Sequence, residues 1–281
     1  MIEIAFLSAL TLIWICFAVI QDIRTKEIAN WLNFSLIIFA LGFRFFYSLF
    51  TLNNFSFFYQ GLIGLGIFFV LGNIFYYGKL FAGGDAKLMI ALGAVLPLTN
   101  NFSSNVRIFL FFLLIFFLVG AVYTLFTSLY IGLKKFKPLK REFKIHFSKN
   151  KKIVLLSLIS AILLGLAGLV FYLSLIYFAI IIFILPYIYL YAKAVDESCM
   201  IKLIPPNDLR EGDWLYKDVI LKGKTIRANW EGLNKKEISL LVKSKKKVLI
   251  REGVPFSPVF LISFILLLVF YKWILTWNMF I

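Results

Sequence analysis

The sequence predicts an all-α polytopic membrane protein with a small α+β domain inserted before its last span. The chain has 281 residues, of which 62% are hydrophobic, and its mean hydropathy is +0.91. Soluble domains are only about half apolar. The 40 residues of Ile153–Ala192 hold no charge, whereas charged residues gather in 134–152 and 193–253. In a membrane protein such basic segments report orientation, so the net charge of +16 does not indicate nucleic-acid binding.

The apolar segments predict six to eight transmembrane helices, with eight favoured, because a helix needs about 20 apolar residues to cross the hydrocarbon. A count of six requires 153–192 to be something other than a hairpin. The predicted spans are 4–20, 31–52, 57–77, 88–98 with a start reaching back toward Leu80, 108–133, two helices within 153–192 that turn near Ser174, and 254–277. The predicted domains are a core at 1–133, a basic loop at 134–152, a hairpin at 153–192, a soluble domain at 193–253 and a final helix at 254–281.

The distribution of Lys and Arg predicts the orientation. With the N-terminus outside, the segments 22–30, 78–87, 134–152 and 193–253 face the cytoplasm and hold 27 of the 30 basic residues. The opposite orientation places nearly all of this charge outside, against the positive-inside rule. We therefore expect both termini outside and the soluble domain in the cytoplasm, where its lysines meet anionic lipid.

The soluble domain shows local signals of a helix and a strand. "NKKEISLLVKS" predicts a short helix with Asn234 as N-cap and Glu237 closing a capping box. "KKKVLI" predicts a strand.

Two carboxylates are predicted at one depth, at the cytoplasmic edge of the membrane. Asp22 ends the first span and Asp85 begins the fourth. Asp85 alone has an ordinary interpretation as a helix N-cap, and Asp22 alone as an interfacial charge beside basic residues. Ionisable groups at membrane depth tend to mark function, however, and Gly83 and Gly84 give room for another backbone to approach.

A carboxylate pair that shares one proton supports peptide hydrolysis without a metal or a nucleophilic side chain. The only histidine, His146, is expected in a solvated loop, which argues against a catalytic Ser–His or Cys–His pair. The two cysteines give no metal-binding pattern. The alternatives are a cation- or proton-coupled transporter using Asp22 and Asp85, and a scaffold without catalysis. Arg44, the one deep charge, is expected to snorkel or to contact Glu3.

The motifs "DIRTKEIANWLN" and, about 60 residues later, "AGGDAKLMIALG" resemble the archaeal prepilin and pre-archaellin (preflagellin) peptidases. These are GxGD-class membrane aspartic proteases related to type IV prepilin peptidases. The segment from "DLREGDW" to the last span also looks like the cytoplasmic domain and final helix of that family.

This resemblance implies that Asp22 and Asp85 are the catalytic pair and that Gly83 and Gly84 belong to a substrate loop before Asp85. It implies an endopeptidase that removes short class III signal peptides, each a basic leader before an apolar helix, at the cytoplasmic membrane face. No cofactor, metal or methyltransferase activity is expected, and the partners are the prepilin or pre-archaellin substrate and membrane lipid. Ala82 departs from the pattern, which has glycine there, and puts the loop geometry in doubt.

The roles within the pair are also predicted. Asp85 begins a helix, where the macrodipole favours a carboxylate, and Lys87 adds positive charge, whereas Asp22 ends a helix. Asp85 is therefore expected to be the ionised base and Asp22 the neutral acid, within a coupled pair.

Overall fold

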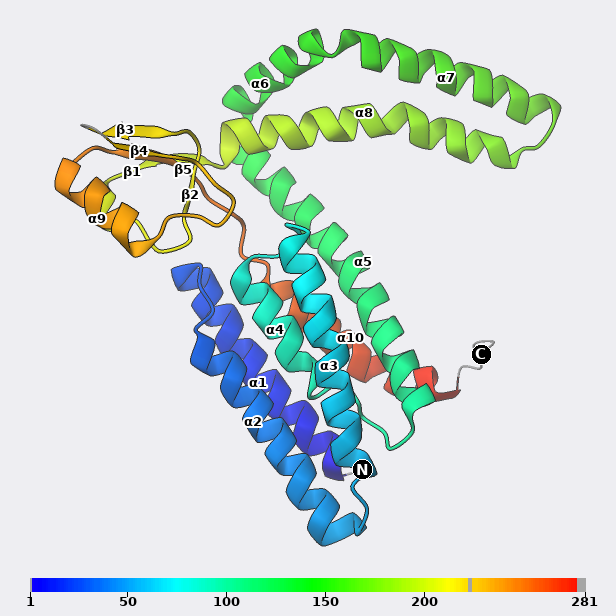
Figure 1. Ribbon diagram of the computed structural model, residues 1–281. Coiled ribbons are helices and arrows are strands. Elements are labelled where there is room, and N and C mark those ends of the chain that lie inside the picture. Colours follow the sequence, from blue (N-terminus) through cyan, green and yellow to red (C-terminus); the bar gives the residue numbers. More distant parts are fainter. Residues whose placement is uncertain (1, 222–223, 277–281) are drawn as a thin grey trace. The chain divides into compact units, whose positions relative to one another are not determined.

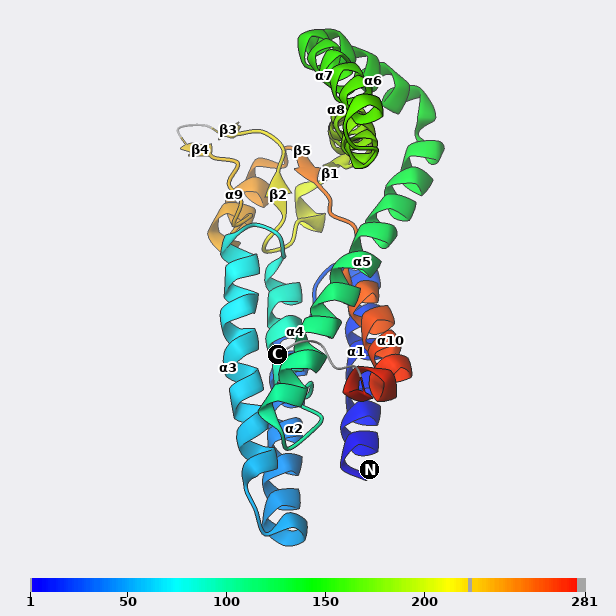
Figure 2. The same ribbon diagram turned by 90° about the vertical axis from the view of Figure 1, so that its right-hand side faces the viewer.

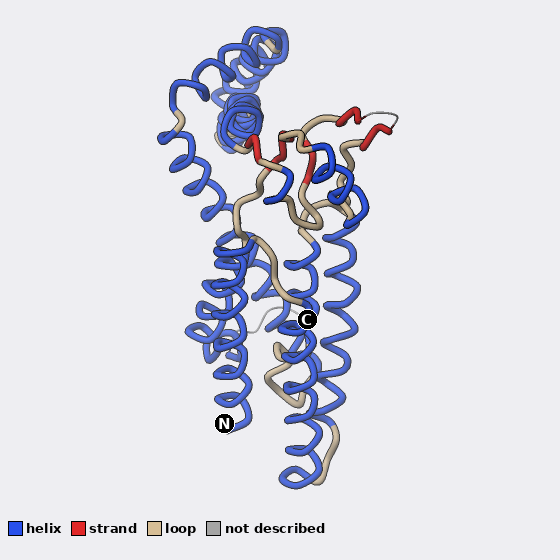
Figure 3. The backbone as a smooth tube through the Cα atoms, turned by 90° about the vertical axis from the view of Figure 1, so that its left-hand side faces the viewer, coloured by secondary structure: helices blue, strands red, loops and turns tan. Residues whose placement is uncertain are grey.

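The computed structural model describes residues 2–221 and 224–276, and helices dominate it (Figure 3). Within the described residues, seven helices are long and apolar enough to cross a membrane. They are α1 (Ile2–Thr25), α2 (Asn30–Tyr47, continued by the π-helical turn Ser48–Leu52), α3 (Ser56–Tyr77), α5 (Phe102–Lys134), α7 (Lys151–Val170), α8 (Ser174–Cys199) and α10 (Ser257–Thr276). The chain is therefore an integral membrane protein. The predicted end of the last span at Trp277 lies outside the described residues.

The fourth predicted span is the one that differs, which is why the structure has seven spanning helices where eight were favoured. Here α4 (Gly83–Gly93) has only 11 residues, about 16 Å of helix, too short to cross. The chain continues without regular helix through residues 94–101 (Figure 1). The Ser56 hydroxyl donates to Asn100 O at 3.1 Å, so this segment ends beside the beginning of α3. The chain thus returns along α3 as expected, but only the first half of the return is helical.

Arg44 explains how the chain leaves helical geometry in this apolar setting. Its side chain, fully buried on α2, donates to Ala94 O and Val95 O at 2.9 Å each, and also to Pro97 O. A fourth bond goes to Phe57 O at 3.0 Å. Non-helical backbone away from water needs such partners within the protein. The expectation that Arg44 snorkels or contacts Glu3 is therefore wrong.

Glycines bring α3 and α4 close together. A Cβ atom at Gly64 would lie 2.4 Å from Gly93 O, and one at Gly93 would lie 2.6 Å from Gly64 O. Distances below 3.0 Å are not tolerated by backbone atoms, so only glycine allows this approach. Small residues are the usual means by which membrane helices pack closely.

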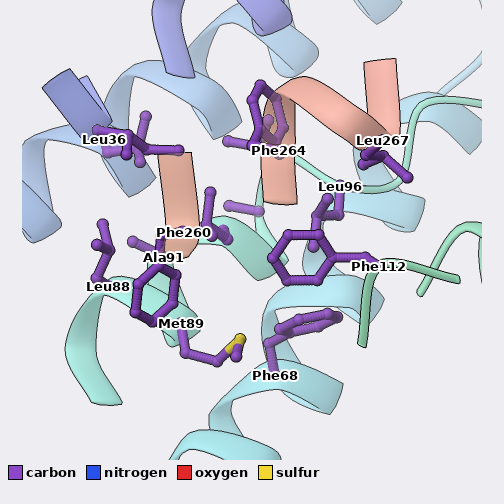
Figure 4. Packing of buried hydrophobic residues seen from close by; sticks show 14 of the residues in the cluster. Leu36, Phe68, Leu88, Met89, Ala91, Leu96, Phe112, Phe260, Phe264 and Leu267 are labelled. Atoms are coloured by element: carbon purple, nitrogen blue, oxygen red, sulfur yellow. The ribbon is translucent and has the colours of Figure 1, made fainter. Parts of the chain in front are cut away.

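The contacts divide the chain into two compact units, one of Met1–Thr124 with Pro255–Ile281 and one of Leu125–Val254. In the first unit α1 packs against α2 and α10, and α4 packs against α2 and α3 (Figure 2). Buried side chains from these helices and from the first half of α5 form one apolar core (Figure 4). The labelled members of that core include Leu36, Phe68, Leu88, Met89, Phe112, Phe260 and Phe264.

The second unit holds the helical hairpin and the small domain. The hairpin is α7 and α8, and the turn at 171–173 falls where the sequence predicted it, just before Ser174. The basic segment 134–152 is not a loop, because most of it forms α6 (Phe136–Lys149). α6 packs along α8, which runs on to Cys199, past the predicted boundary at 192.

The small domain has a three-stranded antiparallel sheet in the order β1–β5–β2, formed by Ile201–Ile204, Val248–Arg251 and Trp214–Leu215. A short 3₁₀ helix (Pro206–Asp208) and the β3–β4 pair (Val219–Leu221, Lys224–Ile226) complete it with α9 (Lys235–Ser244). The predicted capping box of α9 is confirmed: Asn234 accepts from the Glu237 N–H, and Glu237 accepts from the Asn234 N–H. The predicted strand over "KKKVLI" is also confirmed, as β5.

Candidate active site

Asp22 lies in the last turn of α1, on the face that the helix buries. Ile15 and Ala18, on the same face, are fully buried, and Asp22 is 7% exposed. A carboxylate so placed needs a hydrogen-bond donor. Its Oδ2 accepts the backbone N–H of Ser257 at 3.1 Å. Ser257 is the first residue of α10, so the positive end of that helix faces the Asp22 carboxylate.

Asp85 is the third residue of α4, in the first helical turn. It lies outside the seven spanning helices. The residue as a whole is partly exposed, but its carboxyl group is enclosed by protein. Burial, and then the negative charge of Asp22, raise the pKa of Asp85 to about 7. The two aspartates are therefore close enough to act on each other electrostatically, although 62 residues separate them in the chain.

Contacts around the α1–α2 turn hold the end of α1 close to the beginning of α4. The Gln21 side chain accepts the N–H of Ala29 at 3.1 Å. Lys87 donates to the Asn30 side chain at 2.7 Å. Lys26, at the end of α1, takes the left-handed conformation with a φ of 60°. These bonds place both aspartates at one end of the first unit.

Gly83 and Gly84, predicted to belong to a substrate loop, are the first two residues of α4 in the structure, and their contact with a substrate remains a prediction. A Cβ atom at Gly84 would meet Ile28 at 3.4 Å, and one at Gly83 would meet Tyr76 at 3.8 Å, both ordinary contacts. Among the described residues, then, no neighbour requires glycine at either position, and room for a substrate remains a prediction. Ala82, the N-cap, has a φ of −70° and a ψ of 161°, which alanine adopts without strain.

The surroundings of the two aspartates differ from those on which their expected roles were based. The expectation considered the start of α4 but not the start of α10, whose N–H is bonded to Asp22. A hydrogen bond to a carboxylate favours its ionised form, whereas burial of Asp85 favours its neutral form. Lys87, expected to support an ionised Asp85, donates to Asn30. The raised pKa of Asp85 does not agree with the expectation that Asp85 is the ionised base.

Sequence reasoning missed Ser257 and its neighbours as part of this site. Tyr123 donates to Pro255 O at 2.8 Å, and Phe81, just before α4, packs on Phe256 at 6.2 Å between ring centroids. These contacts hold the beginning of α10 beside α4 and α5. A proline in the first turn is a helix-start signal, so "PFSP" indicated where α10 begins. It carried no information on the partner of that helix end.

The segment that holds both aspartates matches a known family. Residues 9–125 match the model of the type IV leader peptidase family. The matched segment covers α1 to the first half of α5 and excludes the small domain and α10, so the resemblance of those parts remains a prediction.

A named relative agrees with this family. The chain is 35% identical over 80 residues to the preflagellin peptidase of Methanococcus maripaludis (strain C6 / ATCC BAA-1332). The aligned part covers 28% of this chain and about a third, 34%, of that protein. The resemblance to prepilin and preflagellin peptidases is thereby confirmed. No solved structure matches the chain significantly.

Proposed function

We propose that the chain is a membrane-embedded aspartic endopeptidase that removes class III signal peptides from prepilin-like or pre-archaellin-like proteins. The observation that carries this proposal is the pair itself: Asp22 and Asp85 interact electrostatically within the segment that matches the leader peptidase family. An aspartic protease uses two such carboxyl groups, one ionised and one neutral, as its catalytic base and acid. Burial and the charge of Asp22 raise the pKa of Asp85, which favours the neutral acid that this chemistry needs.

In the proposed reaction Asp22 is the base and Asp85 is the acid. The ionised Asp22, held by the Ser257 N–H, takes a proton from a water molecule as the water oxygen attacks the scissile carbonyl carbon. The neutral Asp85 donates its proton to the carbonyl oxygen, which gives a neutral tetrahedral diol. Collapse of the diol breaks the C–N bond, and the amine leaves with the proton that Asp22 holds. Asp85 takes back a proton from one diol hydroxyl, which becomes the carbonyl oxygen of the new carboxyl group. The proton balance thus closes within the pair.

The proposed substrate has a basic leader followed by an apolar helix, as the resemblance implies. The proposed site of cleavage is the cytoplasmic edge of the membrane, and the orientation predicted from 27 of the 30 basic residues supports this. An apolar substrate helix can then stay in the lipid while the extended junction before it reaches the pair. Gly83 and Gly84 begin α4 next to Asp85, and we propose that their small size leaves space for this junction.

The proposal is tested by cleavage assays on membranes that contain Asp22→Asn or Asp85→Asn. The substrates are prepilin-like and pre-archaellin-like proteins, and the product masses are determined. We expect each variant to lose more than about 100-fold in activity, because each removes a general acid or base. Glu27→Gln is the matched control, since Glu27 is an exposed carboxylate only five positions from Asp22.

Near-normal cleavage by either Asn variant removes that residue from the mechanism. A second outcome separates the protease from the transporter alternative. If the wild-type protein cleaves none of the substrates but proteoliposomes take up protons or cations in an Asp22-dependent manner, the transporter interpretation holds instead.

A further inference from the structure

Three side chains with metal-binding atoms converge in the second unit of the chain. Glu142 and His146 lie four residues apart on α6, so they project from the same face on successive turns. Glu197 lies on α8, which packs against α6. The His146 Nε2 atom is 3.0 Å from a Glu197 carboxylate oxygen. One ligand atom from each of the three residues lies within 4.8 Å of the other two.

The cluster is built into the α6–α8 contact. The side chain of His146 is only 7% exposed, and those of Glu142 and Glu197 are 19% and 32% exposed. The expectation that His146 sits in a solvated loop is therefore wrong. Leu139 on α6 packs with Ala194, Val195 and Cys199 of α8 in a small apolar core. This packing fixes the helices on which the three ligands sit.

The charges on α6 single out the same residues. The helix carries five Lys and Arg residues but only one acid, Glu142, and the chain's only histidine. The acid and the histidine share the face that meets Glu197. Arg141 lies 3.3 Å from Glu142, but its side chain is 76% exposed, so water screens that pair. Two carboxylates and one imidazole with ligand atoms within 4.8 Å of one another form a donor set that suits a doubly charged ion.

We propose that Glu142, His146 and Glu197 bind a first-row divalent cation, with zinc as the best match to one imidazole and two carboxylates. Ligand bonds of about 2.0–2.2 Å around tetrahedral zinc place neighbouring ligand atoms about 3.3–3.5 Å apart. The His146–Glu197 distance is already near this value, and the widest pair closes by rotation of a glutamate side chain. Three protein ligands leave a fourth position for water. The ion would fasten α6 to α8.

The spacing of residues did not predict this cluster, because Glu197 lies 51 positions after His146. A short metal motif brings its ligands together within one or two turns. Here only the packing of α6 on α8 supplies the third ligand. The alternative without a metal is the direct bond between His146 and Glu197, and it predicts different behaviour in the same experiments.

The test uses the full chain in detergent, purified through a tag without histidine and stripped with a chelator. Zinc is then titrated, and bound metal is measured by mass spectrometry after desalting. We expect one zinc per chain in the wild type. In Glu142→Gln, His146→Gln and Glu197→Gln the zinc affinity should fall more than about 100-fold. This is a larger loss than substitution of a residue that only hydrogen-bonds to a ligand would cause. Asp196→Asn is the matched control, because its carboxylate pairs with Arg251 at 3.1 Å.

A second measurement needs no variant. Because His146 is the only histidine, ¹⁵N labelling of histidine gives the ring signals of one residue. We expect stoichiometric zinc to shift the Nε2 signal, since that nitrogen becomes a ligand. If zinc leaves the ring signals unchanged, or if His146→Gln binds zinc as well as Asp196→Asn does, the metal site is refuted and the direct His146–Glu197 bond stands.

Discussion

Arg44 offers a sharp test of how the short helix α4 is held. We consider Arg44→Met, which keeps much of the side-chain length but removes every donor. In the wild type the guanidinium donates to the carbonyls of Ala94, Val95 and Pro97, beyond the last turn of α4, and to that of Phe57. It also lies 4.3 Å from the centre of the Phe57 ring. The substitution leaves these acceptors without their donor in an apolar setting.

The size of the effect follows from these bonds. A buried acceptor left without a donor costs about 1–3 kcal/mol, so four of them cost about 4–12 kcal/mol. Part of this loss is offset, because burying the charged guanidinium costs several kcal/mol of hydration free energy and the variant no longer carries that cost. We therefore expect Arg44→Met to lower the free energy of unfolding by about 3–5 kcal/mol. Arg44→Lys should lose less, since an ammonium keeps three donors but cannot span four carbonyls.

The assay is unfolding by SDS in mixed micelles, followed by tryptophan fluorescence, and a glycine pair supplies the control. A Cβ atom at Gly61 would lie 2.5 Å from Cδ of Arg44, whereas one at Gly66 would meet nothing within 4 Å. Both glycines are on α3. Gly61→Ala should therefore displace Arg44 and destabilise the protein by about 1–3 kcal/mol. Gly66→Ala should be neutral or slightly stabilising.

Two results would refute this reasoning. One is an Arg44→Met protein whose free energy of unfolding stays within about 1 kcal/mol of the wild-type value. Such a change is smaller than the cost expected when even one buried carbonyl loses its bond to a charged donor. The other is an equal effect of alanine at Gly61 and at Gly66. Either result means that the carbonyls at the end of α4 find other partners at little cost.

Three further predictions concern the site and the orientation. Ser257→Pro removes the N–H that donates to Asp22, and proline is tolerated at the start of a helix. A hydrogen bond to a charged group contributes about 1.5–3 kcal/mol, so its loss should lower kcat/KM about 10- to 100-fold. Ser257→Ala keeps that N–H and should stay close to the wild type, and equal losses in the two variants would exclude a role for the bond. Because the pKa of Asp85 is raised to about 7 and the neutral form is the proposed acid, kcat/KM should fall as the pH rises through that value. A flat profile across neutral pH contradicts the assignment. Cysteines placed in α6 or α9, with Cys16 replaced by serine, should resist an impermeant thiol reagent in intact cells, and labelling from outside would overturn the predicted orientation.

The features that could be predicted from the sequence depend on local patterns. Long apolar runs gave the seven spanning helices, because hydropathy over about 20 residues is a strong signal. The capping box of α9 was predicted from Asn234 and Glu237, since both partners lie within one turn. Counting spans also led to the expectation that Asp22 and Asp85 interact, and the effect of Asp22 on the pKa of Asp85 agrees with it. These inferences need no knowledge of which helices touch.

The features that could not be predicted depend on partners far away in the sequence. The short α4 ends at carbonyls that Arg44 binds from 50 to 53 positions away, so hydropathy alone extended the helix to residue 98. Ser257 reaches Asp22 across 235 positions. A local argument from the macrodipole of α4 therefore favoured an ionised Asp85, because the second helix end was not known to be there.

These distant contacts have one consequence in common: they set the position of α4, and with it that of Asp85. The helix is only 11 residues long, and it is held by polar bonds near each end. Lys87 joins its first turns to Asn30, and Arg44 binds the chain just beyond its last turn. Its side is fixed by the close approach of Gly64 and Gly93, where no other residue fits. A spanning helix could slide or tilt in the lipid, but a short helix held in this way cannot do so without breaking these bonds. The unusual shortness of α4 is thus a means of holding a carboxyl group at a defined place beside Asp22.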